Sequence, residues 1–243
     1  MKRRKYAVLG DVHSNWEALC AVLDHAASQG VDAYLCVGDI VGYNANPSEC
    51  LDKLRDIGCV TVRGNHDHYC SSDASLGDFH PLAASVVDWT RHQLSSDQIE
   101  YLRSLPYKLV VDGFTLVHGT LDMPEKWGYV FDVLDADANF NYQHTSVCFH
   151  GHTHVPVVYE KRDGVVRNED SRVRAALGKK YFVNTGSVGQ PRDHDTRASY
   201  VTYDLNTGEI LIHRVEYDFS ATQKKIHAAR LPERLAKRLE VGK

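Results

Sequence analysis

The chain begins with a short apolar run followed by an amphipathic stretch. Residues Lys5–Gly10 are apolar and rich in β-branched and aromatic side chains, which is typical of a buried strand. Apolar side chains then recur at helical spacing until Gly30, a residue type that commonly ends helices. Ser14 and Glu17 have the spacing of a capping box, so we expect Ser14 to cap this helix.

The same alternation of strand and helix continues along the chain. Strands are expected at Ala33–Gly38 and Val60–Arg63, and between them Pro47 and Gly58 mark the start and end of a second helix. A β-α-β-α-β order favours a parallel sheet, in which ligands bind at the carboxyl ends of the strands.

A helical segment is expected near residues 69–105. It divides into Pro81–Leu94 and Ser95–Leu105, the second with its own serine cap, and His80 is a candidate for lining a substrate cleft. No linker, repeat or low-complexity stretch interrupts the chain, so we expect a single domain over residues 1–243.

The second half of the chain is mostly of strand type. Strands are predicted at Tyr107–Val111, Phe114–Val117, Ser146–Phe149, Val157–Glu160, Tyr181–Val183, Ser199–Leu205 and Ile210–Tyr217. A short helix is expected at Phe131–Tyr142, and a terminal helix at Thr222–Leu239 should break or kink at Pro232.

Composition narrows the possible partners. The hydrophobic fraction of 43% and the charged fraction of 25% are those of a globular protein with a real core. The formal net charge of −4 argues against nucleic acid as a partner. The basic start of the chain precedes an apolar run too short for a signal peptide, and no stretch is long enough to span a membrane.

The cysteines indicate the compartment. The six cysteines form no Cys-x-x-Cys pair and no framework spacing, and Cys36 and Cys148 lie in apolar strand-like runs. We therefore expect free thiols in a reducing compartment, and hence a cytoplasmic protein.

Five short polar motifs follow expected strands. They are Asp11-Val12-His13, Gly38-Asp39, Gly64-Asn65-His66-Asp67, His118-Gly119 and Gly151-His152-Thr153-His154. A chain that needed only to fold would not place such hard-to-bury groups at the ends of its core strands. Two metal ions at a common sheet edge would account for all of them.

The residue types indicate the kind of metal site. The candidate ligands are Asp11, His13, Asp39, Asn65, His118, His152 and His154. Asp39 stands alone and could bridge two cations, whereas each Asp-x-His or His-x-His pair would point into one site if its segment were extended. The set lacks a thiolate, which favours an open site for Mn, Fe, Zn, Co or Ni, with Mn or Fe preferred.

In this order, the motifs resemble the calcineurin-like metallophosphoesterase superfamily from Asp11 to about Ser199. The resemblance implies an α/β fold, a four-layer α/β/β/α sandwich with two mixed sheets and the dinuclear site at their edge. It implies one ion on Asp11, His13, Asp39 and His154. It implies a second ion on Asp39, Asn65, His118 and His152, so that Asp39 bridges.

The resemblance also implies a reaction. Two cations would lower the pKa of a shared water, and the resulting bridging hydroxide would attack phosphorus in line. His66 matches the family's histidine near the leaving group, where it would act as a catalytic acid and protonate the leaving oxygen. Asp67 is expected to cap the next turn instead of taking part in the chemistry.

One position departs from the protein-phosphatase branch of this superfamily. Gly42 stands where that branch has a second Asp, so the carboxylate that would orient His66 is absent and a protein phosphatase is disfavoured. Gly42-Tyr43 and the segment 184–192 instead resemble small phosphodiesterases similar to dinucleoside polyphosphate hydrolases. Candidate substrate contacts are Arg192 as a phosphate clamp, Tyr43 and Asn44, and the main-chain N–H groups of 184–189 could face an anion.

The remaining histidines receive less specific assignments. His150 could be structural or support the ligands, and His194 is expected to be exposed. The histidines expected to be solvated are His25, His92, His144, His213 and His227.

The leading hypothesis is therefore a dinuclear-metal phosphodiesterase for small nucleotides or dinucleoside polyphosphates. A broad phosphomonoesterase, a nuclease and a non-catalytic metal-binding scaffold are the alternatives. The acidic charge weighs against the nuclease, and the complete ligand set weighs against the scaffold. A homodimer is compatible with the sequence.

Overall fold

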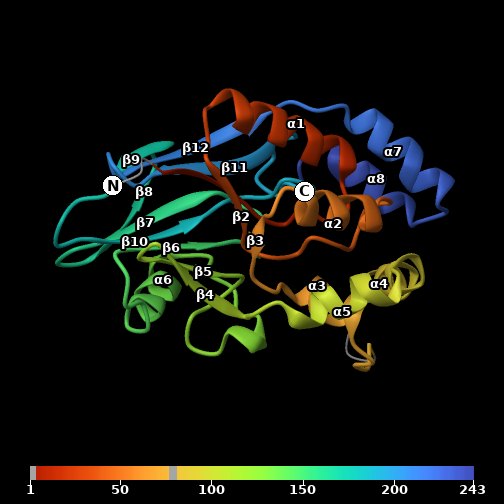
Figure 1. Cartoon of the computed structure of the whole chain (residues 1–243), viewed down its shortest axis with the longest axis horizontal. Helices are drawn as coiled ribbons and strands as arrows, with labels where there is room; N and C mark the ends of the chain where they lie inside the picture. Colours follow the sequence, from red (N-terminus) through yellow and green to blue (C-terminus); the bar gives the residue numbers. More distant parts are fainter. Residues whose placement is uncertain (1–3, 77–80) are drawn as a thin grey trace.

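In the computed structural model, which describes residues 4–76 and 81–243, two six-stranded sheets lie face to face between helices (Figure 1). The first sheet has the order β3 (Val60–Thr61), β2 (Ala33–Cys36), β1 (Lys5–Leu9), β11 (Ala198–Asp204), β12 (Glu209–Val215), β9 (Arg172–Arg174). The second has the order β4 (Lys108–Val111), β5 (Phe114–Val117), β6 (Val147–His150), β10 (Lys180–Asn184), β7 (Val157–Lys161), β8 (Val165–Asn168). Both sheets are mixed: β1, β2 and β3 are parallel, as are β5, β6 and β10, and the other pairs are antiparallel.

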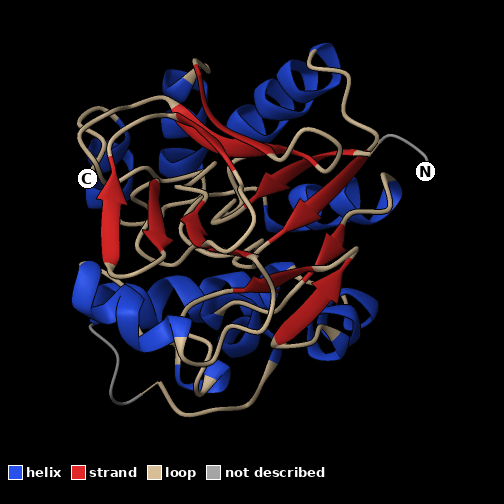
Figure 2. Ribbon diagram, turned by 90° about the vertical axis from the view of Figure 1, so that its left-hand side faces the viewer, coloured by secondary structure: helices blue, strands red, loops and turns tan. Residues whose placement is uncertain are grey.

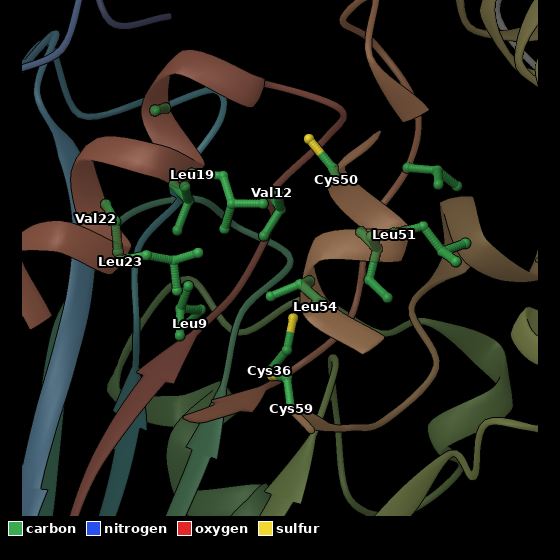
Figure 3. Packing of buried hydrophobic residues seen from close by; sticks show 14 of the residues in the cluster. Leu9, Val12, Leu19, Val22, Leu23, Cys36, Cys50, Leu51, Leu54 and Cys59 are labelled. Atoms are coloured by element: carbon green, nitrogen blue, oxygen red, sulfur yellow. The ribbon is translucent and has the colours of Figure 1, made fainter. Parts of the chain in front are cut away.

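Strand β1 shows how the layers arise from the sequence. Its side chains alternate, so Tyr6 and Val8 enter the cluster between the two sheets. Ala7 and Leu9 point to the other face and pack beneath α1 (Trp16–Ser28) and α2 (Pro47–Asp56), as Figure 3 shows for Leu9. Because both faces are covered, this strand is an unbroken apolar run, as the sequence predicted.

Strand β6 of the second sheet also sends alternate side chains to opposite faces. Val147 and Phe149 face the other sheet, whereas Cys148 faces outward and joins a cluster with Phe140 of α6 (Val133–Phe140). The sandwich seen from its side in Figure 2 therefore has four layers, α/β/β/α. The predicted fold class is confirmed. We propose that the chain is one domain, because the central cluster takes side chains from both sheets.

The helical segment after β3 is also confirmed. It contains α3 (Asn65–Ser71), α4 (Pro81–Gln93) and α5 (Ser96–Ser104), and so it begins slightly earlier than expected. Ser95 caps α5 as predicted, with its Oγ accepting from the Gln98 N–H at 3.2 Å. The prediction for His80 falls outside the described residues.

Three details differ from the sequence prediction. The N-cap of α1 is Asn15, whose Oδ1 accepts from the Ala18 N–H, because Ser14 has a left-handed backbone with φ 57°. The polar strands β8 and β9 were not predicted, since neither has an apolar alternation that stands out. The terminal helical stretch is divided at Pro232 into α7 (Phe219–Ala228) and α8 (Glu233–Leu239), as expected for proline.

Two histidines expected to be solvated are not. His25 Nδ1 lies 2.8 Å from the Tyr200 hydroxyl, and the half-buried ring of His213 stacks on Tyr200 at 4.7 Å. The prediction was wrong because strand β12 carries His213 against the buried Tyr200 of β11, a pairing that a single helix or strand pattern does not reveal. His92, His144 and His227 are exposed, as expected.

His213 should make the protein less stable in mild acid. Burial, aided by the charge of His25, lowers the pKa of His213 to about 4, against about 6.5 in an unfolded chain. Between these values the unfolded state binds more protons, so stability falls as the pH falls through this range. We expect His213→Gln to reduce the loss of unfolding free energy between pH 7 and pH 4.5 by about 1 kcal/mol, allowing for partial exposure. Urea denaturation measures this, with exposed His92→Gln as the control; equal losses in both variants would contradict it.

The cysteines and the helices give two further observations. The six cysteines are free, and burial raises the pKa of Cys36 and Cys148 well above the ordinary pKa of a thiol.

Among the described residues, no helix combines the length and apolar character needed to cross a bilayer.

Candidate metal centre

The seven predicted ligands converge at one edge of the paired sheets. Each follows the carboxyl end of a strand: β1 for Asp11 and His13, β2 for Asp39, β3 for Asn65, β5 for His118, and β6 for His152 and His154. Within each sheet these strands run parallel to one another, so their carboxyl ends meet at the same edge. The two carboxylates and four imidazoles are buried, with at most 5% of any one exposed.

The local backbone is not extended, which corrects one expectation. Five of the residues have a left-handed φ: Asp11 51°, His13 46°, Asp39 55°, His152 70° and His154 62°. Such conformations cost about 1 kcal/mol or more each and persist where surrounding bonds hold them. Here main-chain bonds do so, for example Asp11 N–H to Gly38 O at 3.0 Å and His13 N–H to Asp39 O at 2.9 Å. Each pair is therefore shaped by turns and not by strand alternation.

The first group of side chains consists of Asp11, His13 and His154. His154 Nε2 lies 3.1 Å from His13 Nε2 and 3.2 Å from Asp11 Oδ1. Asp11 is held in turn by the His152 N–H, at 3.0 Å from Oδ2. A side chain at Gly151 would put its Cβ 2.3 Å from that oxygen, so this close approach requires glycine.

The second group consists of Asp39, His118 and His152, with Asn65 beside them. His118 Nε2 lies 3.1 Å from His152 Nδ1 and 3.0 Å from Asn65 Oδ1. His152 and His154 therefore belong to different groups, although only one residue separates them in the chain.

Asp39 connects the two groups. Its Oδ2 lies 3.5 Å from His13 Nε2 in the first group and 3.4 Å from His118 Nε2 in the second. Its other oxygen accepts the His66 N–H at 2.8 Å, which fixes the carboxylate plane. A carboxylate oxygen placed between two sets of imidazole nitrogens is suited to bridging two cations.

The tautomers show that a cation fits here. His13, His118 and His154 each direct Nδ1 at a main-chain oxygen, of Val41, Val37 and Gln190 respectively, at 3.1, 2.9 and 2.6 Å. In the neutral rings of His13 and His154, where Nδ1 donates its proton, Nε2 carries a bare lone pair. Two such lone pairs then face each other 3.1 Å apart at His13 and His154, which is repulsive unless a cation or a proton lies between them.

The electrostatics agree with this arrangement. Burial lowers the pKa of His13 and His154, and that of His152 to about 3, so these imidazoles are neutral and able to coordinate at pH 7. Burial alone would raise the pKa of Asp39, but the nearby imidazoles outweigh it and lower it. Burial likewise opposes protonation of His118, yet Asp39 outweighs it and raises its pKa to about 9.

His66 lies beside this centre and is positioned by packing instead of by a carboxylate. Its ring contacts Tyr43 at 4.4 Å and His13 at 4.8 Å, and its Nδ1 is buried without a hydrogen-bond partner among the described residues. A Cβ at Gly42 would lie 2.4 Å from that nitrogen. The ring therefore occupies the space that a side chain at position 42 would need. Burial lowers the pKa of His66 to about 4.

Asp67 does more than the expected cap. Its carboxylate accepts the Gly64 N–H at the start of α3, and also the N–H groups of Asp39, Ile40 and Val41. Burial, followed by the charge of Asp39, raises its pKa to about 7. Asp67 thus fixes the loop that carries Asp39. The sequence indicated this second role of Asp67 only by its place next to His66, because its partners in the loop of Asp39 lie 26 to 28 residues away.

The proposed substrate contacts Arg192 and Asn44 differ in how accessible they are. Arg192 is half-buried, with its guanidinium 5.7 Å from the Tyr43 ring centre and its Nη2 3.4 Å from the Tyr43 hydroxyl. Asn44 is fully buried and donates to the main-chain oxygens of His13 and Gly189, so it links two loops, and its geometry does not support a substrate contact.

Within the segment 184–189, which was expected to turn its N–H groups to an anion, those of Thr185 and Gly186 donate to His150 O and Asn184 Oδ1 instead. The N–H of Val188 donates to Gly10 O, that of Gly189 to Asp11 O, and that of Gln190 to Ser187 Oγ. These bonds tie the segment to the loop after β1, so its function is to support Asp11. His150 is buried, stacks on Phe182 at 4.1 Å and has a pKa lowered by burial to about 3, whereas His194 is exposed as expected.

Aromatic side chains near the centre were not anticipated. The Tyr129 ring stacks on His152 at 4.0 Å, and Trp127 lies 6.0 Å from His118. Nothing in the local pattern of residues 127–131 indicates this position, because the contact depends on how their loop folds back over β6.

Comparison with known proteins gives consistent matches. Residues 5–208 match the model of the calcineurin-like phosphoesterase superfamily domain. The chain is 38% identical to the uncharacterized protein MJ0912 of Methanocaldococcus jannaschii, over 100% of both chains.

Solved structures extend the likeness to the whole fold. A metallophosphoesterase from Sphaerobacter thermophilus matches with a TM-score of 0.88 and 37% identity over 100% of both chains. The hypothetical protein PH1004 from Pyrococcus horikoshii OT3 matches with a TM-score of 0.83 and 21% identity over 98% of both chains, which shows a shared fold.

Proposed function

Because the chain belongs to the calcineurin-like phosphoesterase superfamily, whose members are metal-dependent hydrolases, we propose that it cleaves small phosphodiesters with two divalent ions. Nucleotides and dinucleoside polyphosphates are the proposed substrates. One observation carries the proposal: Asp39 Oδ2 lies within 3.5 Å of a buried imidazole Nε2 atom in each of the two groups. A buried arrangement of this kind costs stability unless cations occupy it.

The ligands divide as the two groups do. Asp11, His13 and His154 would hold one ion, and Asn65, His118 and His152 the other, with Asp39 shared. Nitrogen and oxygen donors without a thiolate suit Mn or Fe best among Mn, Fe, Zn, Co and Ni. The main-chain acceptors behind His13, His118 and His154 keep the rings oriented, as outer hydrogen bonds do in metal sites.

Two ions bound here would supply Lewis acidity, activating a water and neutralising phosphate oxygens. The residues of the chain do the remaining work. Arg192 can hold a non-bridging phosphate oxygen, since its guanidinium is permanently charged and partly accessible. His66 is the proposed group beside the leaving oxygen, donating a hydrogen bond or a proton to it.

Removal of metal tests this function. Dialysis against a chelator is expected to abolish hydrolysis of bis(p-nitrophenyl) phosphate, and adding back Mn²⁺ should restore it. Metal content measured on the same samples should rise to two ions per chain. Activity that is indifferent to chelation would exclude the proposal, and inactivity of the metal-loaded protein on a wide substrate panel would favour a scaffold.

The same samples separate diesters from monoesters. Comparing bis(p-nitrophenyl) phosphate with p-nitrophenyl phosphate on one preparation removes differences in metal loading. A preference for the monoester would replace the phosphodiesterase by a phosphomonoesterase. We also propose a cytoplasmic location, which is supported by the six free thiols.

A further inference from the structure

A pocket with an unusual charge lies next to the metal centre. It has a volume of about 240 Å³ and is lined by Tyr43, Leu82, Ala83, Arg234 and Arg238. Tyr43 connects it to the centre, because its ring also contacts His13 at 4.6 Å and His66 at 4.4 Å. The pocket and the metal centre are therefore one aromatic side chain apart.

Three arginines lie around Tyr43. Arg234 and Arg238 come from α8, and Arg192 approaches from the loop after β10 and hydrogen-bonds to the Tyr43 hydroxyl at 3.4 Å. Within residues 4–76 and 81–243, none of the three forms an ion pair with an Asp or Glu side chain. Arg238 Nε donates to the main-chain oxygen of Lys243 at 2.5 Å.

The like charges act on Arg238, which is half-buried. Burial, followed by the charge of Arg192, lowers the pKa of Arg238, and Arg234 acts in the same direction. Arg192 Nε is buried and has no partner among the described residues. Elsewhere on α8 the chain does pair its charges, as Lys237 does with Glu233 at 2.8 Å. Guanidinium groups that gather at a cavity, with no carboxylate partner among the described residues, are suited to an anionic ligand.

We propose that this pocket binds a second phosphate group of the substrate, beyond the one that is cleaved. The inference rests on the proposed function and narrows it to esters that carry at least two phosphates, such as nucleoside or dinucleoside polyphosphates. A guanidinium offers paired donors that match phosphate oxygens, and two arginines one helical turn apart can clasp one group. Arg234 and Arg238 lie outside the region that matches the superfamily domain, residues 5–208.

The position of Tyr43 explains how the two sites would work together. Phosphates joined through oxygen lie close to one another, so a scissile phosphate at the metal centre places its neighbour near the adjoining wall. Arg192, which contacts Tyr43, would lie between the two phosphates and could bind either one. The pocket would then favour substrates that carry more than one linked phosphate, and the reaction at the metal centre would be unchanged.

The first experiment compares substrates on the metal-loaded enzyme. We expect R234Q/R238Q to lower kcat/KM for diadenosine tetraphosphate by at least about tenfold, mainly through KM, since the charge-assisted hydrogen bonds of both guanidinium groups are lost. Hydrolysis of the p-nitrophenyl ester of thymidine 5′-monophosphate, which has no second phosphate, should change less than about twofold. K237Q removes a charge from the same helix and is the matched control. Equal losses on both substrates would overturn the proposal.

The second experiment does not depend on turnover. Calorimetry on the metal-loaded protein would compare AMP, inorganic phosphate and the non-hydrolysable α,β-methylene analogue of ADP. We expect the double variant to lose about tenfold in affinity for the analogue alone. Equal weakening for inorganic phosphate would mean a simple anion site and contradict the proposal. If no substrate were hydrolysed but the analogue still lost affinity, the proposed reaction would fail while the phosphate pocket stood.

A structural role for the arginines gives a different result. Removing unpaired like charges should leave Tm unchanged or raise it, whereas arginines needed for packing would lower it. R234K/R238K keeps both charges and loses the paired donors, so it should restore part of the affinity for the analogue. A lower Tm together with no rescue by lysine would overturn the assignment.

Discussion

Replacing Asp39 by asparagine is expected to lower phosphodiester hydrolysis by at least about 10³-fold. The amide that replaces the carboxylate is neutral and offers a single acceptor oxygen, so it cannot neutralise and bridge two cations. Losing several kcal/mol of charge stabilisation in the transition state corresponds to a rate loss of this size. Hydrolysis of bis(p-nitrophenyl) phosphate and metal content per chain are the two measurements.

The two readouts should change together. We expect the D39N protein to retain no more than one ion per chain, because Oδ2 is placed between the two groups at 3.5 and 3.4 Å. Asp88→Asn, on α4 with 65% of its side chain exposed, is the control and should match the wild type. Retention of two ions and of activity in D39N would show that this carboxylate does not bridge.

Replacing Gly42 by alanine is expected to lower turnover by about 10²-fold while both ions remain bound. The new Cβ would lie 2.4 Å from His66 Nδ1, so the ring must move from its place against Tyr43. A displaced histidine loses its contribution at the leaving group, which is typically 10²-fold or more. Steady-state kinetics and metal analysis on the same sample check both parts.

Gly113 provides a matched control for the backbone. Its φ of +87° is close to the +93° of Gly42, but nothing lies within 4 Å of a Cβ built there. Gly113→Ala should therefore share the backbone cost of about 1 kcal/mol and keep full turnover. If both alanine variants lost activity equally, strain and not the position of His66 would be the cause.

His66→Gln distinguishes the two roles proposed for the ring. Glutamine can donate a hydrogen bond but cannot transfer a proton. If His66 protonates the leaving oxygen, the variant should lose more activity with an alkyl leaving group than with p-nitrophenolate, which needs no proton. An equal loss with both would mean that His66 acts only by hydrogen bonding.

The layers of the fold could be predicted from the sequence because buried strands have a local signature. Tyr6, Ala7, Val8 and Leu9 are all apolar, and a strand covered on both faces requires this. Pro47, Gly58 and Pro232 likewise end or begin helices through their own backbone properties. The sequence prediction missed edge strands such as β8, which have no buried residue and therefore show no clear alternation of apolar and polar residues.

Other features depend on contacts between distant segments. Asp67 was assigned a cap, yet it also binds the loop of Asp39. The segment 184–189 was assigned to anion binding, yet its N–H groups are used to hold the loop after β1. In both cases the residue type indicated hydrogen bonding correctly, and only the folded chain decided the partner.

The sequence by itself determined which chemical groups would lie at the sheet edge, because each motif directly follows a strand and parallel strands deliver their ends to one side. The tertiary structure alone decided how those groups are divided and oriented. His152 and His154 enter different groups through left-handed turns, Asp39 lies between the groups, and α8 brings two arginines to the pocket beside Tyr43. The physical reason is that strand formation depends on neighbours along the chain, whereas coordination and charge balance depend on neighbours in space.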